Sequence, residues 1–290
     1  MTETPLTIPV VSSVKEIGSR YRAWVVDIWG VMHNGHSAFP RAAAATRAFR
    51  ESGGIVVLLS NSPRPSPEVQ AQLRQFGVPD EAYDATVTSG DLTRHELGKY
   101  KGARVFHLGP ERDLPIFAGL DVTLSDWQDA DVMVCSGPFD DETETPDDYV
   151  ELFREMAARK LPMICANPDQ LVERGQRLIY CAGALASAYE KAGGAVVYAG
   201  KPHAPVYDLA FETIARLAGS NVGKDEVLAV GDGVHTDIAG AVNFGLNALF
   251  VASALHAPGD GGEALDASHI AELFAETPRL PIAATHALDW

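Results

Sequence analysis

Short apolar runs alternate along most of the chain with segments whose apolar residues recur at helical spacing. Strands are predicted at residues 21–27, 54–59, 104–108, 122–124, 131–135, 162–165, 196–198, 227–230 and 248–251. Helices are predicted near 39–52, 69–76, 151–159, 184–191, 206–217 and 239–244. Strands that alternate with helices in this way predict an α/β fold with a largely parallel sheet.

The pattern divides into two sets of elements. A second set begins near Ser89 and ends at Gly193-Gly194, where a helix stops, and the first pattern then resumes. The simplest organisation is a core domain from 1–88 and 193–290 with an inserted α/β domain at 89–192. Inside the insertion, the acidic stretch Asp140–Glu144 is predicted to be a solvated loop, because it has no fixed spacing of metal ligands.

Composition narrows the classes of partner. The chain has 290 residues, a formal net charge of -16 and 46% hydrophobic residues, as expected of a folded protein with a sizeable core. The negative charge disfavours nucleic acid and anionic membranes as partners, but a small phosphorylated ligand remains compatible with it. The three cysteines lie in or beside apolar runs and are predicted to be buried thiols. No signal peptide or membrane span is indicated, so a cytoplasmic location is expected by default.

Polar residues follow four of the predicted core strands. They are Asp27, the pair Ser60-Asn61, Lys201, and Asp232 with Asp237. The carboxyl ends of parallel strands share one edge of a sheet, so these groups are expected to converge. Taken singly, a strand-end aspartate is more often a turn cap, Ser60 a helix N-cap, and Lys201 a solvated surface residue.

Taken together, the four sites suit phosphoryl transfer. A carboxylate can act as the nucleophile, and oxygen ligands can hold Mg²⁺ to offset its repulsion of the phosphate. A serine hydroxyl, backbone N–H groups and a lysine ammonium can bind the phosphoryl oxygens. The order and context of the four sites therefore favour a functional interpretation over four unrelated structural ones.

The residues at these sites resemble the four motifs of a known family. Asp27-Ile28-Trp29-Gly30-Val31, Leu58–Ser62, Gly200-Lys201-Pro202, and Gly231-Asp232 with Thr236-Asp237 are similar to those of the haloacid dehalogenase superfamily of Mg²⁺-dependent phosphatases. Segments 166–169 and 182–185 resemble the large cap of its class IIA group, which includes NagD-like and nitrophenyl phosphatase-like proteins. The resemblance implies a doubly wound, Rossmann-like core with an inserted α/β cap that closes over the site, and it leaves a homodimer open.

The resemblance also implies a role for each matching residue. Asp27 would be the nucleophile that accepts the phosphoryl group of a small phosphorylated metabolite such as a sugar phosphate. The Mg²⁺ ligands would be Asp27, the backbone carbonyl of Trp29, and Asp232, and Asp237 would hold metal-bound water or the lysine.

The resemblance implies substrate-binding roles for further residues. Ser60, Asn61 and Lys201 would bind the transferring phosphoryl group. Asn167 and Asp169, on a loop of the cap, would either face the leaving group or be structural.

Trp29 departs from the family pattern, in which the residue two after the nucleophile is usually an aspartate that serves as the general acid and base. Such catalysis is worth roughly 10²–10⁴-fold in rate, and an indole cannot supply it. Three hypotheses follow: a phosphatase that needs little acid catalysis or uses His33 or His36, a protein that forms a long-lived phospho-enzyme, and a non-catalytic binder of a phosphorylated metabolite. A dinucleotide-binding Rossmann domain is disfavoured, because no Gly-x-Gly-x-x-Gly follows the first strand.

Overall fold

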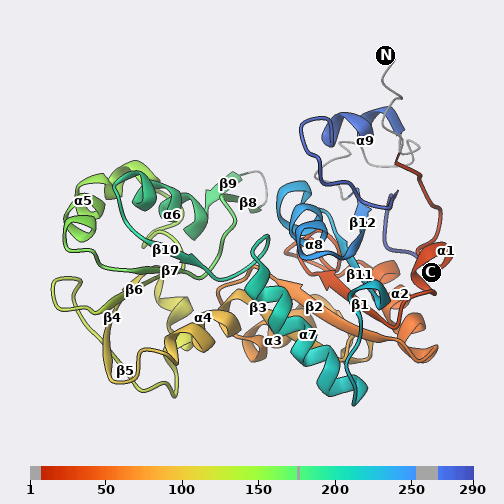
Figure 1. Cartoon of the computed structure of the whole chain (residues 1–290), viewed down its shortest axis with the longest axis horizontal. Coiled ribbons are helices and arrows are strands. Elements are labelled where there is room, and N and C mark those ends of the chain that lie inside the picture. The colour runs from red at the N-terminus through yellow and green to blue at the C-terminus, as the bar shows by residue number, and fades with distance from the viewer. Residues whose placement is uncertain (1–7, 175–176, 253–266) are drawn as a thin grey trace. The chain divides into compact units, whose positions relative to one another are not determined.

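The computed structural model describes residues 8–174, 177–252 and 267–290. The chain forms two compact units (Figure 1). Unit 1 comprises Met1–Ser60, Gln70–Thr86 and Tyr207–Trp290, and unit 2 comprises Asn61–Val69 and Val87–Val206. The insertion expected at 89–192 lies within unit 2, which also takes in residues 61–69, 87–88 and 193–206. The role of that insertion as a cap stays a prediction.

Unit 1 is built on a six-stranded sheet. Its order is β13 (Ala283–Thr285), β12 (Asn247–Val251), β11 (Val227–Gly231), β1 (Ala23–Asp27), β2 (Ile55–Ser60) and β3 (Ala85–Thr88). The neighbours from β13 to β2 pair in parallel. The predicted α/β fold with a Rossmann-like sheet is therefore confirmed.

The two strands that pair with β1 define the edge of this sheet at which a ligand is expected to bind. The chain passes from β1 to β2 on one side, whereas β11 pairs with the other side of β1, so the strand order reverses between β1 and β11. In open α/β sheets, ligands bind outside the carboxyl ends of the strands at such a switch point. All five residues of β1 are buried, as expected for a central parallel strand that is covered on both faces.

Helices cover this sheet. They are α1 (Lys15–Gly18), α2 (Pro40–Glu51), α3 (Ser66–Phe76), α7 (Ala204–Ala218), α8 (Ala239–Phe244) and α9 (Ala267–Leu273), with short helical turns η1 (Asp80–Ala82), η4 (Lys224–Glu226) and η5 (Val234–Ile238). The indole of Trp24 on β1 stacks on Phe49 of α2 with ring centroids 4.0 Å apart. Its Nε1–H donates to the carbonyl of Gly18 over 3.1 Å, so this buried indole is fully engaged.

Unit 2 has its own parallel sheet. The order is β10 (Val196–Tyr198), β7 (Met163–Cys165), β6 (Val132–Cys135), β4 (Ala103–Leu108) and β5 (Val122–Leu124). The helical elements are α4 (Ser89–Leu97), η2 (Glu111–Phe117), η3 (Pro146–Tyr149), α5 (Val150–Ala158) and α6 (Ala182–Lys191). Phe153 of α5 and Leu185 and Tyr189 of α6 form a buried core with Met133 and Met163 of the sheet.

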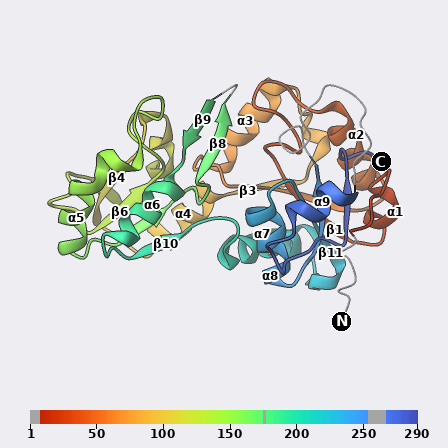
Figure 2. The same cartoon turned by 90° about the horizontal axis from the view of Figure 1, so that it is seen from above.

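A two-stranded antiparallel hairpin completes unit 2 and is visible beside α6 in Figure 2. It consists of β8 (Leu171–Arg174) and β9 (Arg177–Tyr180), which the sequence did not predict. The expectation of a solvated loop at 140–144 is wrong for Asp141, whose side chain is only 9% exposed. Asp141 pairs with Arg112 and Arg174, and Glu142 pairs with Arg174 and Arg177. The ion pairs of Arg174 and Arg177 connect the hairpin to the acidic loop.

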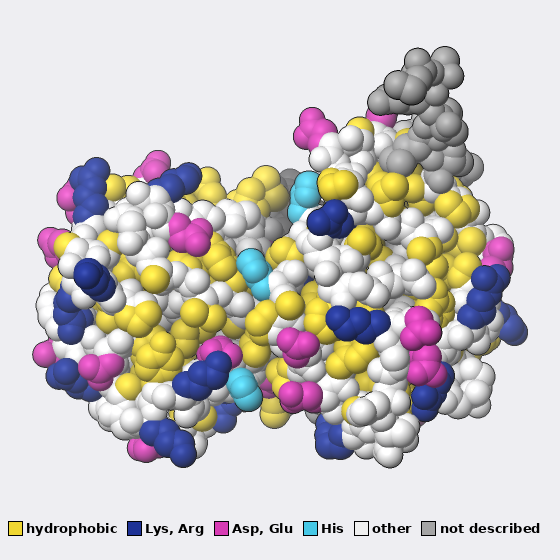
Figure 3. All heavy atoms as spheres, viewed as in Figure 1, with side chains coloured by type: hydrophobic (Ala, Val, Ile, Leu, Met, Phe, Trp, Pro, Cys, Tyr) yellow, Lys and Arg dark blue, Asp and Glu magenta, His cyan; other side chains and the backbone are white. Residues whose placement is uncertain are grey.

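Several bulk expectations can be compared with the structure. The three cysteines are free and buried, as predicted. Within the described part of the chain, no helix has the length and apolar character needed to cross a membrane. On the face drawn in Figure 3, basic and acidic side chains are interspersed over both units.

Candidate active site

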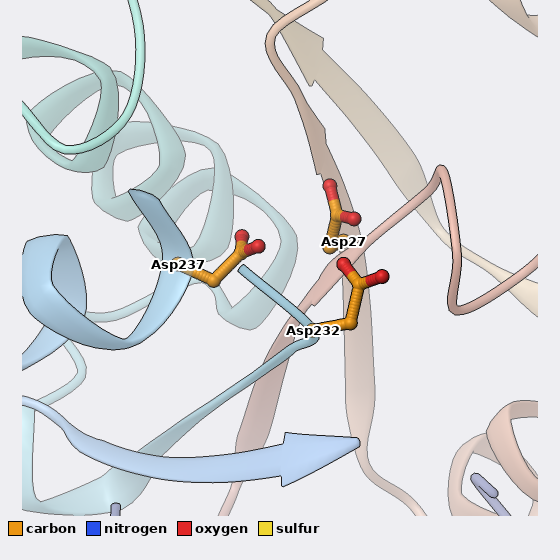
Figure 4. A group of neighbouring side chains, drawn as sticks. All are labelled: Asp27, Asp232 and Asp237. Carbon is orange, nitrogen blue, oxygen red and sulfur yellow. The ribbon is translucent and has the colours of Figure 1, made fainter. Parts of the chain in front are cut away.

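The three aspartates predicted to hold a metal ion lie together in unit 1. Asp27 ends β1, Asp232 directly follows β11, and Asp237 lies on η5. All three are buried, and each offers a carboxylate oxygen within 4.8 Å of the others. Figure 4 shows the three carboxylates reaching into the same region at the switch point between β1 and β11. The interpretation of Asp27 as a mere turn cap does not account for this convergence.

Two glycines make room for these carboxylates. Gly30 has φ +82°, and a Cβ built on it would lie 2.0 Å from Oδ2 of Asp232. A Cβ on Gly231 would lie 2.4 Å from Cβ and Cγ of Asp237. Both positions therefore require glycine, Gly30 for its backbone conformation as well as for space. The requirement for Gly231 is visible in the sequence, where it stands next to Asp232. The requirement for Gly30 is not, because it depends on Asp232, which lies about 200 positions away.

Asp237 is positioned by its own turn and by a helix. The N–H of Gly233 donates to its Oδ2 over 3.0 Å, and the hydroxyl of Tyr207 on α7 donates to its backbone carbonyl over 3.3 Å. The turn that carries it, η5, is a single π-helical turn, a form that is often found at functional sites. Sequence analysis did not identify Tyr207, because nothing in the pattern of α7 marks its hydroxyl.

The donor set fits a hard divalent cation. Three buried carboxylates within 4.8 Å repel one another unless positive charge lies between them or protons are bound. Mg²⁺ prefers oxygen ligands and is commonly held by one or two carboxylates together with water and phosphate oxygens. Asp27 and Asp232 would be its side-chain ligands, with Asp237 beside them. A contribution from the carbonyl of Trp29 stays a prediction.

Ser60 is the last residue of β2, one position beyond Leu59, which is the register partner of Asp27. The two side chains therefore belong to adjacent carboxyl ends of the same sheet. Helix α3 begins only at Ser66, so Ser60 is not its N-cap. Ser60 is 9% exposed, which is compatible with a contact to a bound phosphoryl group.

Trp29 and His33 pack together on the loop after β1, with ring centroids 5.3 Å apart and an edge-to-face arrangement. The N–H of Gly35 donates to Nδ1 of His33 over 3.0 Å. His33 is 2% exposed, and burial lowers its pKa to about 4. A neutral imidazole whose Nδ1 is already occupied cannot replace the missing acid and base at neutral pH. His36 is exposed on the same loop, and a role for it stays a prediction.

The other predicted phosphate-binding residues lie in unit 2, where Asn61 connects them. Its Oδ1 accepts from the backbone N–H of Lys201 over 2.8 Å, and its Nδ2 donates to the carbonyl of Lys201 and to Oδ1 of Asp169. Lys201 is 3% exposed, so it is not the solvated surface lysine that was the alternative. Asn61 therefore orders the Lys201 turn and the Asp169 loop in one hydrogen-bonded group.

Asn167 has a local partner. Its Oδ1 accepts from the N–H of Asp169 over 3.1 Å, which closes a turn after β7. Its side chain also lowers the pKa of the Cys181 thiol by a hydrogen bond, although burial raises that pKa overall to about 12. These contacts are those of a structural residue, whereas Asp169 reaches Asn61. Contact of either residue with a leaving group stays a prediction.

Comparison with known proteins places this arrangement in a family. The sequence pattern of haloacid dehalogenase-like hydrolases matches residues 24–123, and the HAD-hydrolase-like pattern matches residues 198–277. A crystal structure of a haloacid dehalogenase-like hydrolase from Brucella suis 1330 is 44% identical, with a TM-score of 0.84, over 96% of this chain and 99% of that one. The chain belongs to the haloacid dehalogenase-like hydrolase family and is a hydrolase, as its motifs predicted.

Two curated relatives are more distant. The 5'-nucleotidase YutF of Bacillus subtilis is 26% identical over 80% of this chain and 87% of its own length. An acid sugar phosphatase of Staphylococcus haemolyticus is 25% identical over 80% of this chain and 85% of its own length.

Proposed function

We propose that the protein is a Mg²⁺-dependent phosphatase that transfers the phosphoryl group of a small phosphomonoester to Asp27 and then to water. The observation that carries the proposal is the convergence of three buried carboxylates at the switch point, next to the strand that ends at Ser60. The names of the two curated relatives, a nucleotidase and a sugar phosphatase, support a phosphomonoester as the substrate.

The reaction has two steps. In the first, a carboxylate oxygen of Asp27 forms a bond to phosphorus while the bond from phosphorus to the leaving oxygen breaks, which gives an aspartyl-phosphate and an alkoxide that takes up a proton. In the second, water displaces the carboxylate, releases inorganic phosphate and restores Asp27. The hydroxyl of Ser60, the backbone N–H of Asn61 and the ammonium of Lys201 would bind the phosphoryl oxygens in both steps. Mg²⁺, when bound, supplies positive charge that offsets the repulsion between phosphate and carboxylate.

A second candidate function rests on the loop after β1. The indole of Trp29 has no group that titrates near neutral pH, and His33 has a pKa of about 4 and an occupied Nδ1. Without a general acid and base, both steps slow down. In the second step the leaving group is always the Asp27 carboxylate, so a substrate with a better leaving group cannot compensate for the slower attack of water. A long-lived phospho-enzyme, or a protein that binds a phosphorylated metabolite, is the outcome if water attack becomes negligible.

Phosphate release from a panel of phosphomonoesters separates these functions. Wild type, Asp27→Asn and Trp29→Asp are each assayed with Mg²⁺ and with EDTA. Turnover that needs Mg²⁺ and disappears in Asp27→Asn is the expected result for the phosphatase. If wild type is inactive and Trp29→Asp gains turnover, the protein has the scaffold without the acid and base, and mass spectrometry for phosphate on Asp27 then distinguishes phospho-enzyme from binder. Inactivity of both would contradict the proposal.

The remaining expectations concern partners and location. A small phosphorylated metabolite as the ligand is part of the proposal. A homodimer, the absence of nucleic acid and membrane partners, and a cytoplasmic location stay predictions.

A further inference from the structure

The side chain of Asn61 bonds to both backbone groups of a single residue. Asn61 comes directly after β2, is the first residue of unit 2, and is 5% exposed. Its Oδ1 accepts from the N–H of Lys201 over 2.8 Å, and its Nδ2 donates to the carbonyl of Lys201 over 3.0 Å. Two residues of neighbouring strands exchange the same pair of bonds, so the amide holds the Lys201 backbone as a strand would.

The remaining positions of the amide are also engaged. The second N–H of Nδ2 donates to Oδ1 of Asp169 over 2.8 Å, and Oδ1 of Asn61 lies 3.4 Å from the hydroxyl of Ser89. These partners fix which way the amide is turned. The N–H of Lys201 can only donate, whereas its carbonyl and the Asp169 carboxylate accept, so a flipped amide would set donor against donor and acceptor against acceptor.

This arrangement leaves the Asn61 side chain no donor for a phosphate. Phosphate oxygens accept hydrogen bonds, and an asparagine side chain has two N–H donors, both of which are used here. Its Oδ1 is an acceptor, which a phosphate oxygen repels. The backbone N–H of Asn61 is a separate donor, so the contact that its motif implies falls to the backbone and not to the side chain.

Packing encloses the amide. A Cβ on Gly200, the residue before Lys201, would lie 2.2 Å from Oγ of Ser89, 2.6 Å from Oδ1 of Asn61 and 2.7 Å from Cδ of Pro168. The segment at 61, the start of α4 and the loop after β7 therefore all meet at Gly200. A rearrangement of the amide would have to displace these neighbours.

The residue held in this way is the one whose placement matters for a phosphate. A lysine carries a compact charge on a flexible four-carbon stem, so the position of its ammonium depends on where its backbone is fixed. Misplacement of a group that contacts the reacting atoms by ~1 Å can cost about 10²-fold in rate. Loss of the amide would release the backbone of Lys201 on both of its polar sides.

We propose that the side chain of Asn61 is a positioning residue that acts through Lys201, with Asp169 as the acceptor that orients the amide. The amide fixes the Lys201 backbone so that the ammonium meets the phosphoryl group. This inference rests on the proposed phosphatase function and replaces direct phosphate binding by the Asn61 side chain with an indirect role.

A double-mutant cycle tests whether Asn61 acts through Lys201. Wild type, Asn61→Ala, Lys201→Ala and the double variant are unfolded thermally in Mg²⁺ at increasing concentrations of inorganic phosphate, and the rise in Tm gives the dissociation constant of phosphate. The backbone N–H at position 61 is present in all four. Gln70→Ala is the control, because Gln70 on α3 also donates from its amide, to the hydroxyl of Thr86 over 3.0 Å.

The expected pattern is a loss that depends on Lys201. Asn61→Ala should weaken phosphate binding about tenfold when Lys201 is present and less than about twofold when it is alanine, and Gln70→Ala should change it less than about twofold. A merely structural amide would lower Tm in both backgrounds without changing the affinity for phosphate. If Asn61→Ala does not fold, Asn61→Ser, whose hydroxyl is too short to bridge both backbone groups of Lys201, is used in the same cycle.

The outcomes separate this inference from the proposed function. Equal losses in both backgrounds would mean that the side chain binds phosphate independently of Lys201, and an unchanged affinity in Asn61→Ala would mean that it positions nothing; either overturns the inference while turnover of phosphomonoesters by wild type still supports the phosphatase. Phosphate binding without turnover contradicts the phosphatase alone, and the cycle still decides the role of Asn61. A wild type that binds no phosphate overturns the inference, since Lys201 then holds no phosphoryl group.

Discussion

The contact between Gly30 and Asp232 allows a sharp test of the metal site. In Gly30→Ala, the added Cβ would lie 2.0 Å from Oδ2 of Asp232, and ordinary contact begins at 3.4 Å, so the carboxylate has to retreat by about 1.4 Å. Mg²⁺ requires oxygen ligands at about 2.0–2.1 Å in near-ideal geometry, and misplacement of a reacting group by ~1 Å can cost about 10²-fold in rate. We expect kcat/KM to fall at least about 100-fold.

The same substitution also strains the backbone, and a second glycine isolates that effect. A residue with a Cβ at φ +82° costs about 1–2 kcal/mol, which corresponds to a decrease in Tm of roughly 2–8 °C. Gly53 has φ +94°, and a Cβ there meets nothing within 4 Å. Gly53→Ala should therefore show a similar decrease in Tm and keep its activity within twofold.

The assay combines phosphate release with thermal unfolding in Mg²⁺ and in EDTA. Because a ligand that binds only the folded state raises Tm, Mg²⁺ should stabilise wild type and Gly53→Ala but not Gly30→Ala. If Gly30→Ala keeps both its activity and its Mg²⁺-dependent rise in Tm, Asp232 is not a ligand and the reasoning is refuted. If Gly53→Ala loses activity as well, backbone strain and not the displaced carboxylate is the cause.

Three further predictions follow from other contacts. Asp237→Asn keeps an oxygen that can accept from Gly233 but removes one of three neighbouring charges. The Tm measured in EDTA should therefore increase, and the further increase in Tm on adding Mg²⁺ should become smaller than in wild type. An unchanged increase in Tm on adding Mg²⁺ would contradict a role for Asp237. Burial lowers the pKa of His107 to about 4, below its unfolded value near 6.5, so the stability that the neutral imidazole contributes is complete above about pH 6.5 and decreases by up to about 3 kcal/mol toward pH 4. In urea unfolding, the free energy of unfolding of His107→Gln should therefore decrease less steeply between pH 6.5 and pH 4 than that of wild type. An equal decrease in both proteins would contradict the burial of His107. Trp24→Phe loses the hydrogen bond to Gly18 and part of the stack on Phe49, so the free energy of unfolding should decrease by about 2 kcal/mol, and an unchanged urea midpoint would show that the site repacks.

The sequence predicted the main functional edge because strand ends are local features. Asp27, Ser60 and Asp232 each follow an apolar run, and parallel pairing alone brings such ends together. The most informative departures lie where a side chain depends on distant neighbours. His33 looked like an acid and base candidate by position, but its burial against Phe76, with ring centroids 4.9 Å apart, lowers its pKa.

The β8–β9 hairpin shows the same limit for secondary structure. Its strands are short, and Arg174 and Arg177 find their partners in the acidic loop more than 30 residues earlier. The acidic loop itself was predicted to be solvated, because runs of charged residues are usually exposed to solvent. Strand β3 was also missed, since Ala85–Thr88 offers only four residues before the helix that begins at Ser89.

The order of strands in unit 1 has a consequence for how the chain folds as it is synthesised. Residue Ala23 of β1 pairs with Ile55 on one side and with Val227, 204 positions later, on the other. Most of unit 2 is one continuous stretch, Val87–Val206, and is complete before β11 has left the ribosome. Unit 2 can therefore fold first, and the edge of the apolar strand β1 that pairs with β11 remains unpaired during that time. The late half of unit 1, and not the inserted stretch, sets the time at which the three aspartates first meet.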